Sequence, residues 1–206
     1  MQRERPTALL IDFDGVLRHW DPELTAGVER RHGLPEGSLL RTALEWSRAQ
    51  PALTGQISHA EWMAEVTRAL AEQTGDPERA RVAVEEWERD RGAVDPDVLG
   101  FIRELRAGGV RVGLATNATD LLDADLAALN LVDELDVVIN SSVVGVHKPA
   151  KDYFHEACRA VGALPKQVLF VDDDDRTVRG ARAAGLSAHR WTGPHDLTYL
   201  RAAFTA

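Results

Sequence analysis

Residues 8–16 read ALLIDFDGV, a short apolar run that ends in two aspartates, Asp12 and Asp14, one residue apart. The run favours a buried strand of a parallel sheet over a helix, because it is short and Gly15 stops it. Both carboxylates then emerge at the carboxyl edge of the sheet, where ligands bind in open α/β proteins. Taken alone, the motif is more typical of a strand end whose acids cap a turn, so the rest of the chain has to decide.

The composition is that of one globular domain with room for a small insertion. The chain has 206 residues, of which 44% are hydrophobic and 28% charged, as in ordinary globular proteins. Its net charge of −9 argues against a nucleic-acid partner, because such binders neutralise phosphates with Lys and Arg. Small metal-bound or anionic substrates are compatible with this charge, since a local site can be positive in an acidic protein.

Cys158 is the single cysteine, so an intramolecular disulfide is impossible and a reducing, cytoplasmic location is expected. Its spacing from Phe154 and Val161 places it on the apolar face of a helix, as a core residue. The apolar run after the charged N-terminus is too short for a secretory signal. No apolar segment approaches the roughly 18 residues that span a bilayer, so a membrane partner is not expected. We expect a monomer or a homodimer.

Residues 21–91 are predicted to form an all-helical subdomain. Asp21-Pro22 is a good helix start, and Ser58 with Glu61 three residues later has the pattern of a capping box. Four helices are expected, at residues 23–32, 37–47, 58–73 and 76–91. The remaining residues, 1–20 and 92–206, are predicted to form the core.

From residue 95 onward, helices and strands alternate. The pattern predicts helices at 95–105, 119–129, 151–161 and 177–184, and strands at 110–115, 136–139, 167–171 and 187–190. Such alternation indicates a parallel sheet with helices on both faces. The predicted fold class is therefore α/β, a three-layer Rossmann-like parallel sheet with an inserted all-helical subdomain.

Polar side chains follow three of the predicted strands. Asp12 and Asp14 end the first, Thr116 and Asn117 end the second, and the run Asp172–Asp175 ends another. Because the carboxyl ends of parallel strands meet at one edge, a single cleft would collect these groups.

Lys148 is the obvious cation to enter this acidic cleft. Clustered carboxylates repel one another and are costly to desolvate unless cations lie among them. Carboxylate oxygens are hard ligands, which favours Mg²⁺ over zinc or copper. Mg²⁺ together with Lys148 would make a site able to hold a phosphate dianion.

In this order, the motifs resemble those of the haloacid dehalogenase superfamily of hydrolases, and more closely its phosphatase-like members with a helical (C1-type) cap. Each motif is weak alone, but four in order are a strong signal. The resemblance spans about residues 8–185 and places residues 21–91 where the family inserts its cap. The matching residues are Asp12, Asp14, Gly15 and Val16, then Thr116, then Lys148, and finally Asp172 and Asp173.

The resemblance implies a Mg²⁺-dependent phosphatase that acts on a small phosphorylated metabolite. Asp12 would be the nucleophile and would form an aspartyl phosphate, while Asp14 would act first as general acid and then as general base. The phosphoryl oxygens would be held by Thr116, by the backbone amides near Asn117, and by Lys148.

The resemblance also implies the metal ligands. Mg²⁺ would lie between Asp12, the backbone carbonyl of Asp14, and Asp173, with Asp172 nearby. One position departs from the family pattern, because Thr177 stands where an Asp or Asn is usual. The extra acids Asp174 and Asp175 would either compensate for this change or cap the following helix.

Two alternatives to a phosphatase stay open. Haloacid dehalogenases proper attack carbon, need no metal and lack the second acid of the first motif, so the presence of Asp14 favours phosphoryl transfer. A catalytically weak protein that binds a phosphorylated ligand is the other alternative, suggested by Thr177.

Arg18 and Trp20 follow the nucleophile loop closely. Arg18 is predicted to bind a substrate anion with Trp20 stacked on it, or to be a surface arginine beside a tryptophan packed at the hinge. Trp46, Trp62 and Trp87 are expected to form the core of the helical subdomain rather than a wall facing the substrate.

Overall fold

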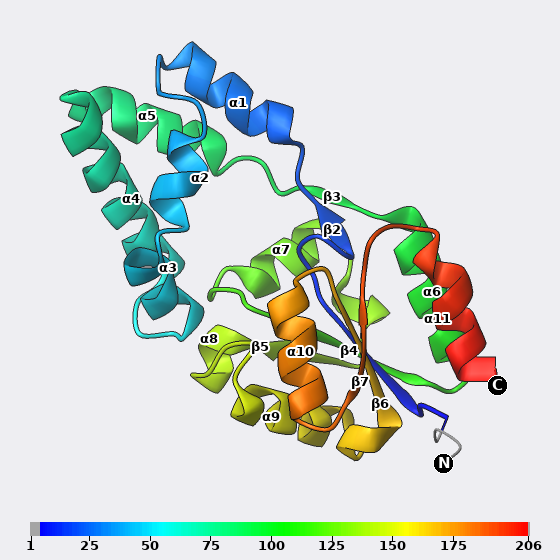
Figure 1. Ribbon diagram of the computed structural model, residues 1–206. Coiled ribbons are helices and arrows are strands. Elements are labelled where there is room, and N and C mark those ends of the chain that lie inside the picture. The colour runs from blue at the N-terminus through cyan, green and yellow to red at the C-terminus, as the bar shows by residue number, and fades with distance from the viewer. Residues whose placement is uncertain (1–4, 206) are drawn as a thin grey trace.

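The computed structural model describes residues 5–205 and contains a five-stranded sheet in which all neighbouring strands are parallel (Figure 1). The strand order is β5-β4-β1-β6-β7, which places β1 at the centre. Their bounds are β1 Ala8–Ile11, β4 Arg111–Thr116, β5 Val137–Asn140, β6 Val168–Asp172 and β7 Ser187–Arg190. The predicted α/β class with a Rossmann-like parallel sheet is confirmed. Residues 1–4 and 206 of the predicted core lie outside the described residues.

Helices cover both faces of the sheet, which explains why all four residues of β1 are buried. Leu9 and Ile11 point into one hydrophobic cluster, and Ala8 and Leu10 into the other, as the alternation of a strand requires. One cluster is closed by α6 (Pro96–Ala107), α7 (Leu122–Ala128) and α11 (Asp196–Thr205), and the other by α9 (Lys151–Val161) and α10 (Asp175–Ala183). Cys158 is buried in the second cluster, and burial raises the pKa of its thiol to about 11.

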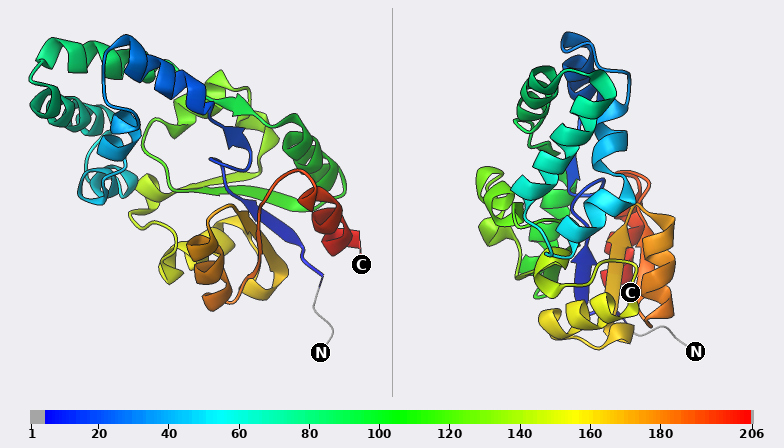
Figure 2. Two further views of the ribbon diagram at one scale, coloured as in Figure 1. Left: turned by 45° about the horizontal axis from the view of Figure 1, so that its top comes forward. Right: turned by 90° about the vertical axis from the view of Figure 1, so that its left-hand side faces the viewer.

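Five helices form an insertion between β1 and β4, here called the helical insertion. They are α1 (Pro22–Arg31), α2 (Ser38–Ala43), α3 (Trp46–Leu53), α4 (His59–Thr74) and α5 (Pro77–Trp87). The insertion has its own hydrophobic cluster, centred on Leu39, Val66 and Leu70. Figures 1 and 2 show it beside the core, on the side where the strands end.

Two short antiparallel strands connect the helical insertion to the core. They are β2 (Arg18–His19) and β3 (Ala93–Val94), and they pair Arg18 with Val94. Sequence patterns did not predict these strands, because two residues are too few to show any periodicity.

Side-chain caps begin most of the predicted helices. Asp21, Asp76 and Asp95 accept hydrogen bonds from backbone N–H groups in the first turns of α1, α5 and α6. The capping box predicted from Ser58 and Glu61 is present at the start of α4. These caps satisfy N–H groups that lack partners within their helices, so the predicted starts lie within one or two residues of the observed ones.

Several details differ from the sequence-based expectation. The helix expected at residues 37–47 ends at Ala43, and α3 begins at Trp46 and includes Pro51. Pro51 argues against a helix there, which is why α3 was not predicted. Trp62 and Trp87 pack against the cluster of the insertion, but Trp46 is 56% exposed, so its expected core role is wrong.

The final helix, α11, was also not predicted. Its buried residues Leu197, Leu200 and Phe204 have helical spacing, so the signal was present. Three short elements complete the core, namely η1 (Val132–Glu134), α8 (Ser141–Val144) and η2 (Pro165–Gln167). None of the helices within residues 5–205 has the length and hydrophobicity needed to cross a membrane.

Candidate active site

Asp12 lies directly after β1, at the carboxyl edge of the sheet. Its backbone N–H still donates to Val171 O at 2.9 Å, which continues the pairing of β1 with β6. Its carboxylate accepts a hydrogen bond from Phe13 N at 2.7 Å and lies 2.7 Å from Lys148 Nζ. Only 8% of Asp12 is exposed, so this carboxylate is positioned by the sheet and by a buried cation.

Lys148 bridges two buried carboxylates. Its Nζ lies 2.7 Å from Asp12 Oδ1 and 2.6 Å from Asp172 Oδ2, at the end of β6. Asn117 holds the backbone on both sides of Lys148, since its Oδ1 accepts from Lys148 N at 2.8 Å and its Nδ2 donates to Lys148 O at 3.1 Å. The loop after β4 therefore fixes where the lysine enters the site.

Burial and neighbouring charges shift the pKa values of both Asp12 and Lys148. Burial raises the pKa of Asp12 to about 8, and the charge of Lys148 opposes that shift while Asp172 adds to it. Burial would lower the pKa of Lys148, but the two carboxylates outweigh it and raise that pKa overall. Lys148 is thus held as an ammonium, and a further cation near Asp12 would favour its ionised form.

Three carboxylates form a candidate metal site. Single oxygens from Asp12, Asp172 and Asp173 lie within 4.8 Å of one another. Gly15, at φ +85°, lets the loop after β1 approach this group, because a Cβ there would lie 2.3 Å from Asp173 Oδ2. The donors are all hard oxygens, which fits Mg²⁺ and does not fit a thiol-preferring metal.

The carboxylate of Asp14 lies in a different environment from that of Asp12. Arg18 binds both oxygens of this carboxylate. Its Nε donates to Oδ1 at 2.7 Å, and its Nη2 donates to Oδ2 at 3.0 Å. Trp20 Nε1 donates to Oδ1 at 2.7 Å. Arg18 Nη1 donates to Asp125 Oδ2 at 2.7 Å. Arg18 is buried, so the expectation of a surface arginine is wrong.

Thr116 ends β4 and is buried at the same edge. Tyr153, which sequence reasoning did not consider, lies beneath it and donates from Oη to Ile139 O at 2.8 Å and to Thr116 O at 3.3 Å. Tyr153 thereby ties α9 to the ends of β4 and β5. The spacing of Tyr153 marks it only as a buried helix residue, so these carbonyl contacts were not predictable.

Asp174 and Thr177 begin α10. Asp174 accepts from Arg176 N at 2.9 Å, and Thr177 Oγ1 donates to Asp174 Oδ2 at 3.0 Å. Asp175 pairs with Arg179 one turn later. The helix-capping interpretation therefore holds for Asp174. The acidic partners of Lys148 are Asp12 and Asp172. The hydroxyl of Thr177 instead bonds to Asp174, the N-cap of α10.

The helical insertion contacts the core beside the site. The rings of Trp46 and His147 meet edge to face at 4.9 Å, next to Lys148. His59 N donates to Asp120 Oδ1 at 2.7 Å. At Gly55 an added Cβ would lie 2.1 Å from Ser142 O, so the loop after α3 passes close to α8.

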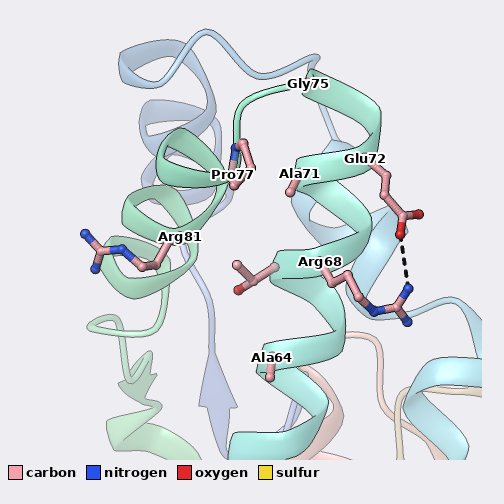
Figure 3. A pocket seen from close by; sticks show the side chains of 8 residues that line it. Ala64, Arg68, Ala71, Glu72, Gly75, Pro77 and Arg81 are labelled. Carbon is pink, nitrogen blue, oxygen red and sulfur yellow. Dashed lines mark hydrogen bonds and ion pairs between the residues drawn. The ribbon is translucent and has the colours of Figure 1, made fainter.

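A cavity of about 730 Å³ lies elsewhere, between α4 and α5 (Figure 3). Figure 3 shows Arg68 and Glu72 of α4 and Pro77 and Arg81 of α5 around it. It contains none of the motif residues, and Arg68 and Arg81 are already paired with glutamates of their own helices. The candidate active site is therefore the group of carboxylates at the sheet edge.

A buried lysine between acids at the carboxyl edge of a Rossmann-like sheet, with helices inserted after the first strand, is the arrangement expected of a hydrolase of the haloacid dehalogenase type. The family model described as haloacid dehalogenase-like hydrolase matches residues 6–185. The chain belongs to this family.

The proteins to which the chain is similar include two phosphatases and a dehalogenase of known structure. Phosphatase MT3486 of Mycobacterium tuberculosis is 30% identical over 191 residues, which cover 89% of this chain and 86% of that protein. A phosphoserine phosphatase of Thermus thermophilus is 37% identical over 124 residues, 58% of this chain and only 50% of its own length. The structure of an L-2-haloacid dehalogenase from Xanthobacter autotrophicus has a TM-score of 0.65 at 25% identity, covering 90% of this chain and 77% of that one.

Proposed function

We propose that the protein is a Mg²⁺-dependent phosphatase that hydrolyses a small phosphorylated metabolite through an aspartyl phosphate on Asp12. The observation that carries this proposal is the position of Lys148 Nζ, 2.7 Å from Asp12 and 2.6 Å from Asp172. This arrangement holds a carboxylate nucleophile and a cation within reach of one phosphoryl group. The similarity to two phosphatases supports the same conclusion.

In the first step, Asp12 attacks phosphorus and the bond to the leaving oxygen breaks. Asp14 gives its proton to that oxygen, so the product leaves as an alcohol. Lys148 and Thr116, with the backbone amides near Asn117, hold the phosphoryl oxygens as charge moves onto them.

In the second step, water attacks the phosphorus of the aspartyl phosphate. Asp14, now a carboxylate, takes a proton from that water, and the bond between phosphorus and Asp12 breaks. Inorganic phosphate leaves, Asp12 is again a carboxylate, and Asp14 is again protonated. The two aspartates of the first motif thus have unequal roles.

Asp12, Asp172, Asp173 and the backbone carbonyl of Asp14 would hold the metal ion. When bound, Mg²⁺ supplies positive charge that keeps Asp12 ionised and offsets the charge of the phosphoryl oxygens. The oxygen cluster within 4.8 Å supports this assignment.

The helical insertion, predicted as residues 21–91, would act as a cap that closes over the site and selects the substrate. Its contacts to the core through Trp46 and His59 support this role. We further propose a cytoplasmic protein, a monomer or homodimer, without a nucleic-acid or membrane partner.

Hydrolysis at carbon is the second candidate function, favoured by the similarity to the dehalogenase structure. Asp14 argues for phosphoryl transfer. The alkoxide that leaves a phosphate ester needs a proton donor, whereas a halide leaves without one.

The test is hydrolysis of p-nitrophenyl phosphate and a panel of sugar, glycolate and nucleotide phosphates, with and without Mg²⁺. We expect Mg²⁺-dependent turnover that Asp12→Asn abolishes, while the matched control Asp133→Asn, an exposed carboxylate away from the cluster, stays active. Activity without Mg²⁺, or activity that survives in Asp12→Asn, contradicts the mechanism. Release of halide from 2-haloacids supports the carbon-centred candidate, and tight phosphate binding without turnover indicates a binding protein.

A further inference from the structure

We infer that Arg18 is a positioning residue that holds Asp14 in the orientation for proton transfer, and that Asp125 of α7 anchors Arg18 for this purpose. The inference rests on the proposed phosphatase function. It replaces the expectation that Arg18 binds a substrate anion, since three of its guanidinium N–H groups already face carboxylates.

The guanidinium of Arg18 is fixed on every side. Its Cζ lies 4.0 Å from the centre of the Phe13 ring and 4.4 Å from that of Trp20. Only 5% of the residue is exposed. The two ring contacts, together with the hydrogen bonds to Asp14 and Asp125, restrict the orientation of the guanidinium, so the directions of its N–H donors are set before a substrate arrives.

Asp14 needs such support. Its backbone forms an isolated bridge to Arg18 after the end of β1, but its side chain is 41% exposed and is not held by packing in the core. A free carboxylate in that position would rotate among several conformations, and a misplaced proton donor loses much of its effect. The two parallel hydrogen bonds from Arg18 select one conformation.

The contacts also distinguish the two oxygens of Asp14. Oδ1 accepts from both Arg18 Nε and Trp20 Nε1, whereas Oδ2 accepts from Arg18 Nη2 alone among residues 5–205. Each carboxylate oxygen has two lone pairs in its plane, so Oδ2 keeps one for a proton. We therefore assign Oδ2 as the oxygen that gives the proton to the leaving group.

Asp125 connects this pair to the rigid core. It is buried on α7, and its Oδ2 lies 2.7 Å from Arg18 Nη1. Arg91, just before β3, approaches its other oxygen at 3.6 Å. Asp125 thus binds an arginine from each of the two segments that connect the helical insertion to the core. A buried ion pair of this kind adds little net stability for its desolvation cost, which is consistent with a role in geometry.

The test compares two esters of similar shape, phenyl phosphate and p-nitrophenyl phosphate. The p-nitrophenolate group leaves readily without a proton, whereas phenolate depends more on the acid. The value of kcat/KM reports the step in which Asp12 is phosphorylated, and so isolates proton donation from the later attack of water.

We expect Arg18→Met to lower kcat/KM for phenyl phosphate by roughly 10- to 100-fold and that for p-nitrophenyl phosphate by less than about threefold. Asp14→Asn should show the same preference for the better leaving group, and the double variant should lose little more than Asp14→Asn alone. Asp125→Asn should give a smaller loss with the same preference. Arg103→Met, which removes an exposed arginine paired with Glu134, is the matched control and should change neither value.

Equal losses in kcat/KM for both esters would overturn the inference. The loss caused by removing a substrate-binding or purely structural residue does not depend on the leaving group. Additive losses in the double variant would also overturn it. If Arg18→Met does not fold, Arg18→Lys tests the same point, since it keeps the charge without the fork and should retain the unequal losses. A wild-type protein without Mg²⁺-dependent turnover, or an active Asp12→Asn variant, would instead refute the proposed function itself.

Discussion

The core and the helical insertion differ in where their polar groups lie. In the core, charged side chains are buried at the strand ends, as Asp12, Lys148 and Asp172 illustrate. In the insertion, most ion pairs are exposed and connect neighbouring turns of one helix, as in Arg81 with Glu78 and Glu85. Burying a charge carries a desolvation cost, so buried charged groups are expected where a function requires them. Exposed ion pairs contribute little to stability. The difference supports the proposal that the chemistry lies in the core and that the insertion controls access and substrate selection.

The largest effect is expected from the core lysine. Lys148→Met leaves Asp12 and Asp172 buried without this cation, and it removes the donor that we propose for the phosphoryl oxygens. We expect kcat to fall by roughly 10²- to 10³-fold and Tm to fall as well. Steady-state kinetics and thermal unfolding measure both. The exposed Lys151 provides the control, Lys151→Met, and an equal loss in that variant would show that the buried position is unimportant.

The next effect is the stabilisation of the core by metal. Burial raises the pKa of Asp12 to about 8 from 3.8, so between these values the folded state holds a proton that the unfolded chain has released. The metal-free protein therefore loses stability as the pH rises through this range. Because Mg²⁺ competes with that proton, the rise in Tm on adding Mg²⁺ should be larger at about pH 9 than at about pH 6.

Asp173→Asn should reduce this Mg²⁺-dependent rise in Tm, because Asp173 belongs to the oxygen cluster. Asp175→Asn is the matched control, since Asp175 pairs with Arg179 instead. An equal reduction in both variants, or a rise that is independent of pH, would show that the cluster is not the metal site.

A smaller effect is expected where the insertion meets the core. Trp46→Ala removes the ring contact with His147, and kcat/KM should fall by roughly threefold because such ring pairs are weak. The exposed Leu44 provides the control, Leu44→Ala, which should leave kcat/KM unchanged. A loss as large as that of Lys148→Met would place part of the chemistry in the insertion and break the distinction between the two regions.

The smallest effect is expected from the exposed pairs of the insertion. Arg81→Ala removes contacts to Glu78 and Glu85 on the solvent side of α5. Its Tm should change by less than about 2 °C, and its kinetics should not change. Thermal unfolding and p-nitrophenyl phosphate turnover test this, and a marked loss of activity would assign a function to the cavity between α4 and α5.

Local patterns predicted much of the core. The run ALLI before Asp12 forms β1, and the helix at 151–161 and the strand at 187–190 have the predicted bounds. These elements follow from short-range periodicity and from residues that stop it. The same reasoning missed α3, which contains Pro51, a residue that is unfavourable inside a helix.

The contacts of the candidate site were less predictable than its residues. Asp12, Lys148 and Asp172 could be placed at one edge because parallel strands share a direction. The bond from Arg18 to Asp125 joins residues 107 positions apart, and Asp125 has no motif around it. This contact depends on the position of α7 beside β2, which the spacing of residues in the sequence does not reveal.

The central claim is that water attacks phosphorus on a covalent Asp12 intermediate. The most direct measurement is a single turnover of p-nitrophenyl phosphate in heavy-oxygen water, followed by mass spectrometry of the released phosphate and of the peptide that contains Asp12. The account predicts the heavy isotope in the phosphate and none in Asp12. Label in the Asp12 carboxylate, as expected when water attacks the acyl carbon of an ester intermediate, would contradict it.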